Sequence, residues 1–303
     1  AEIERLWTRL TELTPLIDPE RTVEQVLELL HTDPARAATS QDEFIALMTE
    51  RQHRALEQLA GTHFDVPEQI RAIDVRVEAA GGALAPQYSL PSEDFSRPGA
   101  VRYPVEGREF FPLFEEITTA YHEGFPGHHL QVGMQMAQGE RLSRFHRVIV
   151  WYPGSGEGWA LYAEHLMGEL GFLEKPDYEI GLIASKLFRS CRVVIDIGVH
   201  LGFPIPDDVD FHPGDAWTFD LAKELLTTRG LQPEAFAHSE IVRYFGWPGQ
   251  AISYKYGEKA ILDLREEARA TSRFDPKRWH ADLLGIGSVG IDLLREQMRA
   301  RWS

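Results

Sequence analysis

The sequence predicts a mainly α-helical protein with a small β element, an α+β fold, and three observations support this prediction. Apolar residues recur at helical spacing through residues 1–72 and again over residues 105–303. Between residues 73 and 104 they form short runs separated by Gly and Pro, as strands do. The chain has 303 residues, 43% of them hydrophobic, which is enough for one sizeable core. We therefore expect a single, mostly helical domain over residues 1–303 with the β element in its middle.

The N-terminal part, residues 1–72, is expected to hold three or four helices. Breaks are predicted at Thr14–Pro15, Asp33–Pro34 and Gly61, where Pro, Gly and capping residues cluster. The stretch 18–20 should begin one helix. The stretch Ser40–Glu43 should begin another, because its spacing fits a capping box.

Residues 73–104 are expected to form a few strands in a small sheet or ribbon, from the runs IDVRVEAA, GGALAPQYSL and AVRYPV. Helical spacing returns with FFPLFEEITTAYHE. Further helices are expected at 133–150, 156–170, 178–201, 215–228, 233–244, 249–269 and 276–301. The Pro- and Asp-rich stretch FPIPDDVDFHPGD is expected to be a loop.

The charge balance argues against several kinds of partner. Forty-seven acidic and 31 basic side chains give a formal charge of -16, which repels nucleic-acid backbones and anionic lipids.

No stretch is long and apolar enough for a membrane span, and no basic-then-apolar leader opens the sequence. We expect a soluble protein, in the cytoplasm unless a leader is missing, in which case it would be secreted or periplasmic. The single Cys191 lies in an apolar run and is expected to be a buried, inert thiol.

The run YHEGFPGHHLQ, residues 121–131, resembles the zinc-hydrolase pattern H-E-x-x-H with residues inserted. On a regular helix His122 and His128 would lie about 240° apart, and His122 and His129 about 10.5 Å apart along the axis. However, Pro126 has no amide to donate, and the neighbouring glycines tolerate unusual backbone angles. A two-residue bulge would place His128 where the second metal-binding histidine belongs. Glu123 would then activate water, and His129 would face the substrate or a second carboxylate.

The next helix, GEGWALYAEHLMGELG, offers carboxylates for such a site. Glu157 and Glu164 are seven residues apart and so share a helix face with apolar neighbours. A carboxylate is costly to bury unless it meets a cation or a hydrogen-bond donor. Glu157 could supply a third metal ligand, and Glu164 could hold a histidine ring from behind. The alternative is that these are ordinary structural residues, because 12 histidines make chance clusters common.

Four motifs occur in one order: YHEGFPGHHLQ, GEGWALYAE, RVVIDIGVH and RYFGWPGQAISYKYG. Together with SRPGAVRY and RWHADLLGIGSVGIDLL, they resemble the bacterial domain-of-unknown-function family 885, which is similar to zinc metallopeptidases of the gluzincin type. The resemblance implies a gluzincin-like helical domain, a Zn²⁺ cofactor, His122, His128 and Glu157 as ligands, and Glu123 as general base. The lengthened interval leaves open whether His128 or His129 is the ligand. Family members are usually longer, so the chain is expected to be a C-terminal portion or a short member.

A hydrolase of this kind also needs a donor for the oxyanion of its tetrahedral intermediate. Tyr254, a few residues past a Pro-Gly turn, is our candidate, with Tyr256 as the second choice and Lys255 as a nearby cation. The alternative is that all three lie on an ordinary helix surface.

Arg192, Asp196 and His200 recur every four residues along an otherwise apolar helix. They form either a solvated edge or a buried polar ladder against the metal site. We favour the ladder, with a catalytic His200 near the substrate and Arg192 paired to a carboxylate.

The sequence thus predicts a zinc-dependent hydrolase, a metallopeptidase that cleaves peptide or small amide substrates. A catalytically inactive, metallopeptidase-like helical scaffold or binding protein is the alternative. A di-iron bundle needs two Glu-x-x-His pairs, and only residues 50–53 match. A serine hydrolase needs Gly-x-Ser-x-Gly, for which residues 154–158 are out of frame.

Overall fold

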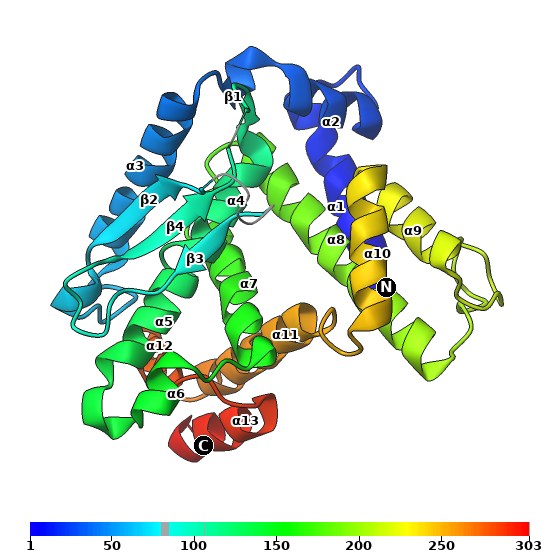
Figure 1. Ribbon diagram of the computed structural model, residues 1–303. Helices are drawn as coiled ribbons and strands as arrows, with labels where there is room; N and C mark the ends of the chain where they lie inside the picture. Colours follow the sequence, from blue (N-terminus) through cyan, green and yellow to red (C-terminus); the bar gives the residue numbers. More distant parts are fainter. Residues whose placement is uncertain (80–84, 106, 303) are drawn as a thin grey trace.

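The computed structural model describes residues 1–79, 85–105 and 107–302. Helices dominate and two small sheets accompany them, which confirms the predicted fold class. In Figure 1, α3 and the larger sheet lie on one side, α8 to α10 lie on the other, and α7 runs between them above α11. Part of the predicted strand region, residues 80–84, lies outside the described residues.

The N-terminal segment forms three α-helices, α1 (Glu2–Ile17), α2 (Val23–Thr32) and α3 (Gln41–Leu59), with 3-10 turns at Pro34–Arg36 and Glu68–Ile70. The break predicted at Thr14–Pro15 is wrong, because Pro15 lies in the last turn of α1 and the helix ends only at Ile17. The start predicted at residues 18–20 is also shifted. Thr22 caps α2 in a reciprocal capping box with Gln25. The cap at Ser40 is confirmed, since its hydroxyl accepts from the Glu43 amide.

The larger sheet has the order β2-β4-β3. β2 (Ile73–Val77) runs parallel to β4 (Gly99–Tyr103), and β3 (Gln87–Ser89) runs antiparallel to β4. A two-residue ladder joins β1 (Ala37–Ala38) to β5 (Phe111–Pro112) directly before the motif helix. The small β element beside the motif is therefore present as predicted.

The remaining helices are α4 (Leu113–Glu123), α5 (His128–Ala137), α6 (Arg144–Val148), α7 (Pro153–Glu169), α8 (Pro176–Leu201), α9 (Phe219–Thr228), α10 (Glu234–Gly246), α11 (Ser253–Arg269), α12 (Pro276–Leu284) and α13 (Ile291–Trp302), with a 3-10 turn at Gly139–Arg141. Two predicted helices are broken: 133–150 is divided between α5 and α6, and 276–301 between α12 and α13. Gly139 and Gly287 adopt positive φ values of 56° and 79° in the interruptions, a conformation that ends a helix.

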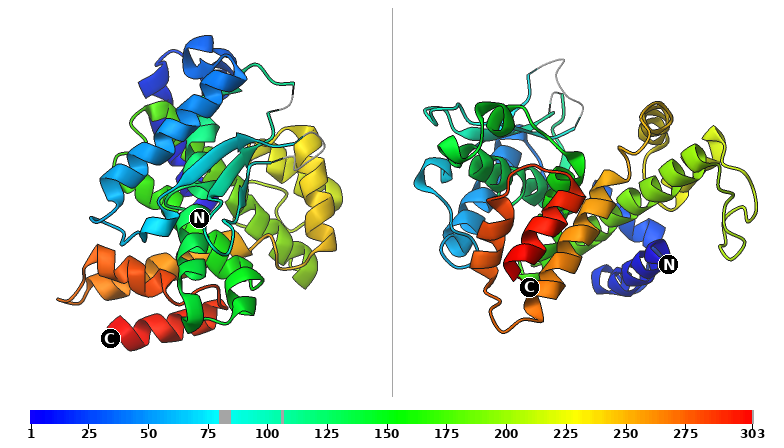
Figure 2. Two further views of the ribbon diagram at one scale, coloured as in Figure 1. Left: turned by 60° about the vertical axis from the view of Figure 1, so that its left-hand side comes forward. Right: turned by 90° about the horizontal axis from the view of Figure 1, so that it is seen from below.

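Three hydrophobic clusters hold the described residues together. The first lies under the sheet and joins α3, α4, α7 and α11 to α13. The second joins α1 and α2 to α8, and the third joins the C-terminal half of α8 to α9 and α10. Figure 2 shows α8 to α10 projecting beyond the body that contains the sheet. Cys191 is fully buried in the third cluster, which confirms the prediction of a buried thiol, and burial raises the pKa of this thiol to about 12.

Within residues 1–79, 85–105 and 107–302, no helix combines the length and the apolar content that crossing a bilayer requires.

Candidate metal centre

The predicted interruption of the motif helix is present, in the form of two helices rather than one bulged helix. α4 ends at Glu123, and α5 begins at His128 after a turn over residues 124–127. The Gly127 amide donates back to the Tyr121 carbonyl at 3.0 Å, so the turn folds tightly onto the end of α4. A Cβ on Gly127 would overlap the His122 carbonyl oxygen. Only glycine therefore permits this close return of the backbone, which brings the rings of His122 and His128 to 4.9 Å between centroids.

Glu164 holds the ring of His122 from behind, as the helical spacing predicts. Its Oε1 lies 2.7 Å from His122 Nδ1. Because a carboxylate only accepts at neutral pH, Nδ1 carries a hydrogen, and Nε2 is directed away from Glu164 into the site. Thr118 and Ser185 donate to the other Glu164 oxygen at 2.7 and 3.3 Å, and Arg189 lies 3.5 Å from Oε1. The carboxylate is thus fixed before it orients the imidazole.

Gln131 does the same for His128. Its Nε2 donates to the Ser155 carbonyl at 3.1 Å, which turns Oε1 toward His128 Nδ1 at 3.2 Å. The amide oxygen can only accept, so His128 also carries its hydrogen on Nδ1. Both histidines consequently direct Nε2 into the site.

The two Nε2 atoms face the same carboxylate oxygen. Glu157 Oε2 lies 3.3 Å from His122 Nε2 and 3.6 Å from His128 Nε2. Four ligand atoms around a tetrahedral zinc at its usual bond lengths lie about 3.3 Å apart. The two distances from Glu157 Oε2 to the imidazole nitrogens are thus close to this spacing.

Glu123 competes with Glu157 for the place of third ligand. The ligand atoms of His122, Glu123 and His128 also lie within 4.8 Å of one another. Glu157 is the better ligand on two grounds. First, a Glu157 oxygen lies 3.3 Å from His122 Nε2, whereas the nearest Glu123 oxygen lies 3.9 Å from it. Second, the same Glu157 oxygen lies 3.6 Å from His128 Nε2. With Glu157 as the third ligand, Glu123 would lie beside a bound ion, in the position of a general base.

The electrostatics of the site call for a cation. Burial alone would lower the pKa of His122, but Glu157 and Glu164 outweigh it and raise that pKa to about 10. Burial opposes ionisation of Glu157, yet His122 and His128 hold its pKa well below the usual range. In Glu123 burial dominates and raises the pKa. At neutral pH the His122 imidazolium therefore balances these carboxylates, and a bound divalent ion would replace its proton and supply the positive charge instead.

His129, the alternative ligand, faces the opposite direction. Its Nε2 donates to the Ile70 carbonyl at 2.8 Å, which leaves Nδ1 to accept from the Tyr88 hydroxyl at 3.1 Å. The ring is buried, and burial lowers its pKa to about 4. Both nitrogens are engaged, so of the two candidates the structure places only His128 against the other site residues.

The predicted polar ladder on α8 is buried at two of its three positions, but it faces α10 rather than the metal residues. Arg192 lies 3.5 Å from a Glu240 oxygen, which confirms its predicted pairing with a carboxylate. Asp196 accepts from the Gly249 amide at 3.1 Å. His200 bonds the Tyr244 carbonyl at 2.9 Å and, among the described residues, makes no contact with the metal-site side chains. The expected position of His200 beside the substrate is therefore not supported.

Tyr254 lies at the beginning of α11, and its ring packs under the Arg192 guanidinium at 4.3 Å. Its hydroxyl accepts from Gln250 at 3.4 Å. α11 approaches α7 closely at Gly257, where a Cβ would overlap the Gly154 backbone. Tyr254 is therefore one turn from a helix crossing beside Glu157, and its role as oxyanion donor stays a prediction.

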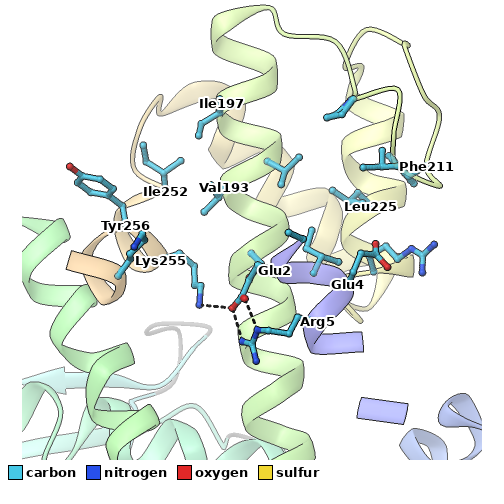
Figure 3. A pocket seen from close by; sticks show the side chains of 18 of the residues that line it. Glu2, Glu4, Arg5, Val193, Ile197, Phe211, Leu225, Ile252, Lys255 and Tyr256 are labelled. Atoms are coloured by element: carbon cyan, nitrogen blue, oxygen red, sulfur yellow. Dashed lines mark hydrogen bonds and ion pairs between the residues drawn. The ribbon is translucent and has the colours of Figure 1, made fainter. Parts of the chain in front are cut away.

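Lys255 and Tyr256 line a different place, a cavity of about 780 Å³ between α1, α8 and the loop after α8. Figure 3 shows Lys255 there in an ion pair with Glu2, next to the apolar side chains Val193 and Ile197. His122, Glu123, His128 and Glu157 are not among the residues that line this cavity. The predicted proximity of Lys255 to the catalytic groups is not supported.

Two glutamines that the sequence reasoning missed complete the site. Gln131 belongs to the motif itself, three residues after His128, and its spacing could have identified it. Gln52 on α3 is fully buried. It donates to the Ala120 carbonyl at 2.8 Å and accepts from the Phe125 amide at 2.6 Å. It binds the backbone of the helix break from a distant part of the sequence, which no local pattern reveals.

No curated protein matches the chain significantly. Two solved structures share its fold. The "putative lipoprotein" from Colwellia psychrerythraea has a TM-score of 0.85 and 28% identity, over 99% of this chain and 50% of its own. A "putative lipoprotein of unknown function" from Shewanella oneidensis has a TM-score of 0.75 and 19% identity, over 98% of this chain and 54% of its own. The chain thus spans about half the length of both. The family model for a bacterial protein of unknown function, DUF885, matches residues 1–298, and the chain belongs to this family.

Proposed function

We propose that the chain is a zinc-dependent hydrolase of peptide or related amide bonds. One observation carries the proposal. The carboxylate oxygen of Glu157 lies 3.3 Å from Nε2 of His122 and 3.6 Å from Nε2 of His128, which is close to the spacing of ligands around a tetrahedral zinc. His122, His128 and Glu157 would hold the ion. When bound, zinc lowers the pKa of water and polarises a carbonyl group.

Glu123 would act as the general base in this reaction. It directly follows His122 at the end of α4, and burial raises the pKa of its carboxyl group. A base whose pKa is raised toward the working pH can take a proton from the attacking water and return it to the leaving amine. Glu164 and Gln131 would keep both imidazoles in the tautomer that directs Nε2 inward.

A peptide is favoured over a small amide by the position of β3. This strand lies at the edge of the described β2-β4-β3 sheet, and the backbone amide of Tyr88 is directed at Glu123. An exposed strand edge can bind an extended chain through backbone hydrogen bonds. An extended peptide paired with β3 would pass beside the proposed base.

The experiment exposes the unmodified protein, Glu123→Gln and Glu157→Ala to zinc and measures the bound metal. Each protein is then incubated with a mixture of synthetic peptides, and cleavage is measured by mass spectrometry. Loss of a general base typically costs between a hundredfold and ten-thousandfold in rate. We expect Glu123→Gln to keep one zinc per chain and to lose at least a hundredfold of turnover, and Glu157→Ala to lose the metal. Cleavage by Glu123→Gln at the unmodified rate would disprove the base assignment.

The scaffold alternative predicts a different outcome. In that case the unmodified chain and Glu123→Gln would show the same absence of cleavage, whether or not zinc binds. A chain that takes up no stoichiometric zinc from buffer would reject the metal site as well.

The compartment is a further part of the proposal. The Colwellia relative is described as a "putative lipoprotein". We infer that the secreted or periplasmic alternative is favoured over the cytoplasm. Fractionation of the source cells, with detection by antibody, tests this, and recovery of the protein in the cytoplasmic fraction would contradict it.

A further inference from the structure

Helix α6 and the link that joins it to α7 expose several large apolar side chains. Phe145, Ile149, Trp151 and Tyr152 are 66%, 65%, 42% and 50% exposed. Single exposed apolar residues are common and need no explanation, whereas a group of them is typical of a binding surface.

This link has a fixed backbone. Gln135 on α5 donates to the His146 carbonyl at 2.9 Å and accepts from the Ser288 amide at 2.7 Å. The Tyr152 amide donates to the Ser288 hydroxyl at 2.8 Å. The apolar side chains are therefore held at the surface by hydrogen bonds at both ends of the link, in the way that a preformed binding site is built.

Trp151 connects this surface to the metal residues. Its ring lies 5.4 Å from the ring of His128, in an edge-on arrangement. Its indole also covers Gly156 so closely that a Cβ there would overlap it. Gly156 directly precedes Glu157 in the sequence. Trp151 thus packs against both elements that supply the candidate ligands His128 and Glu157, while a large part of the indole stays open to solvent.

We propose that Trp151 is a specificity residue of the site and forms an apolar wall for the substrate group next to the bond that is cleaved. The substrate class would be peptides that carry an aromatic or large aliphatic side chain beside that bond. An indole provides a rigid face for such a group, and aromatic pairs add to the free energy of apolar burial. This inference rests on the proposed hydrolase function and adds the substrate class to it.

The test measures binding of two hydroxamic acids to the zinc-loaded protein by titration calorimetry, without turnover. Acetohydroxamic acid reports the metal alone, and phenylacetohydroxamic acid adds an aromatic ring beside the same chelating group. We expect the unmodified protein to prefer the aromatic compound about tenfold, the effect of one good aromatic contact with its burial. Trp151→Ala should reduce the preference to about twofold or less, and the ratio of the two affinities separates this loss from any general weakening of the site.

Two further variants make the test specific. Trp151→Phe keeps an aromatic wall and should retain most of the preference. Trp247→Ala removes another exposed tryptophan, 58% exposed at the end of α10, and should retain all of it. An unchanged preference in Trp151→Ala, or its equal loss in Trp247→Ala, would overturn the inference while the metal site stands. Failure of acetohydroxamic acid to bind the unmodified protein would instead count against the proposed function.

Discussion

Replacement of Glu164 by Gln tests whether the second carboxylate of α7 tunes the metal site. In the structure Glu164 accepts from His122 Nδ1 at 2.7 Å and from Thr118 at 2.7 Å. A glutamine oxygen can still accept from Nδ1, so the His122 ring should keep its orientation. The ring would no longer have a negative charge beside it, and the carboxylate charge is what makes the imidazole a stronger base. Loss of such a partner usually lowers metal affinity 10- to 100-fold, or by about 1.4–2.7 kcal/mol.

The substitution has a second effect that must be separated from the first. Arg189 lies 3.5 Å from Glu164 and is itself largely buried, so removal of the carboxylate leaves a guanidinium that is less well compensated. The expected loss in free energy of unfolding is about 1–3 kcal/mol. Glu169→Gln is the matched control on the same helix, because Glu169 pairs with the buried Arg265 at 2.7 Å.

The assay is competition for zinc against a chelating dye, with urea unfolding of each metal-free variant measured in parallel. Glu169→Gln should lose stability but keep zinc affinity within about twofold, whereas Glu164→Gln should lose both. Equal zinc affinity in the two variants would refute the role of Glu164 in orienting and strengthening His122.

Two other predictions concern the framework of the site. Gly127→Ala should lower the free energy of unfolding by about 1–3 kcal/mol and weaken zinc binding, because its Cβ would overlap the His122 carbonyl oxygen. Gly246→Ala is the control in the same urea and zinc titrations, because its Cβ meets nothing within 4 Å. Identical behaviour of the two variants would contradict the prediction. His280 is buried, and burial lowers its pKa to about 3, so the unfolded chain binds this proton below about pH 6.5 while the folded chain does not. The free energy of unfolding should therefore fall by up to about 1.4 kcal/mol per pH unit as the pH drops below 6.5. Urea unfolding at pH 7.5, 6 and 5 should show a smaller dependence of this free energy on pH in His280→Gln than in the unmodified protein. The same dependence on pH in both proteins would contradict the prediction.

Much of the candidate centre could be predicted because its signals are local. Pro126 and Gly127 indicate the interruption through the missing amide and the freedom of the glycine backbone. Helical periodicity places Glu157 and Glu164 on one face, and both meet His122 in the structure. Short-range rules were sufficient here because each of these signals lies within a single helix or a single turn.

The remaining features depend on tertiary packing, which sequence periodicity does not contain. The spacing of Arg192, Asp196 and His200 correctly groups them on one helix face, but it cannot tell that this face meets α10. Arg189, one turn earlier, and Ser185, two turns earlier, are the members of α8 that reach Glu164. Trp151 has no periodic signal because it lies in an irregular link whose course is set by side-chain hydrogen bonds from α5.

The contacts of Gln52 bear on where the protein could be divided. Its amide group satisfies the Ala120 carbonyl on one side of the helix break and the Phe125 amide on the other. A chain shortened to begin after α3 would leave both backbone groups buried without their partner, and each such group costs about 1–3 kcal/mol. The histidine pair is therefore not separable from the first third of the sequence. A protease cut in α3 should therefore loosen the contacts of Gln52 with the helix break even though the motif itself stays intact.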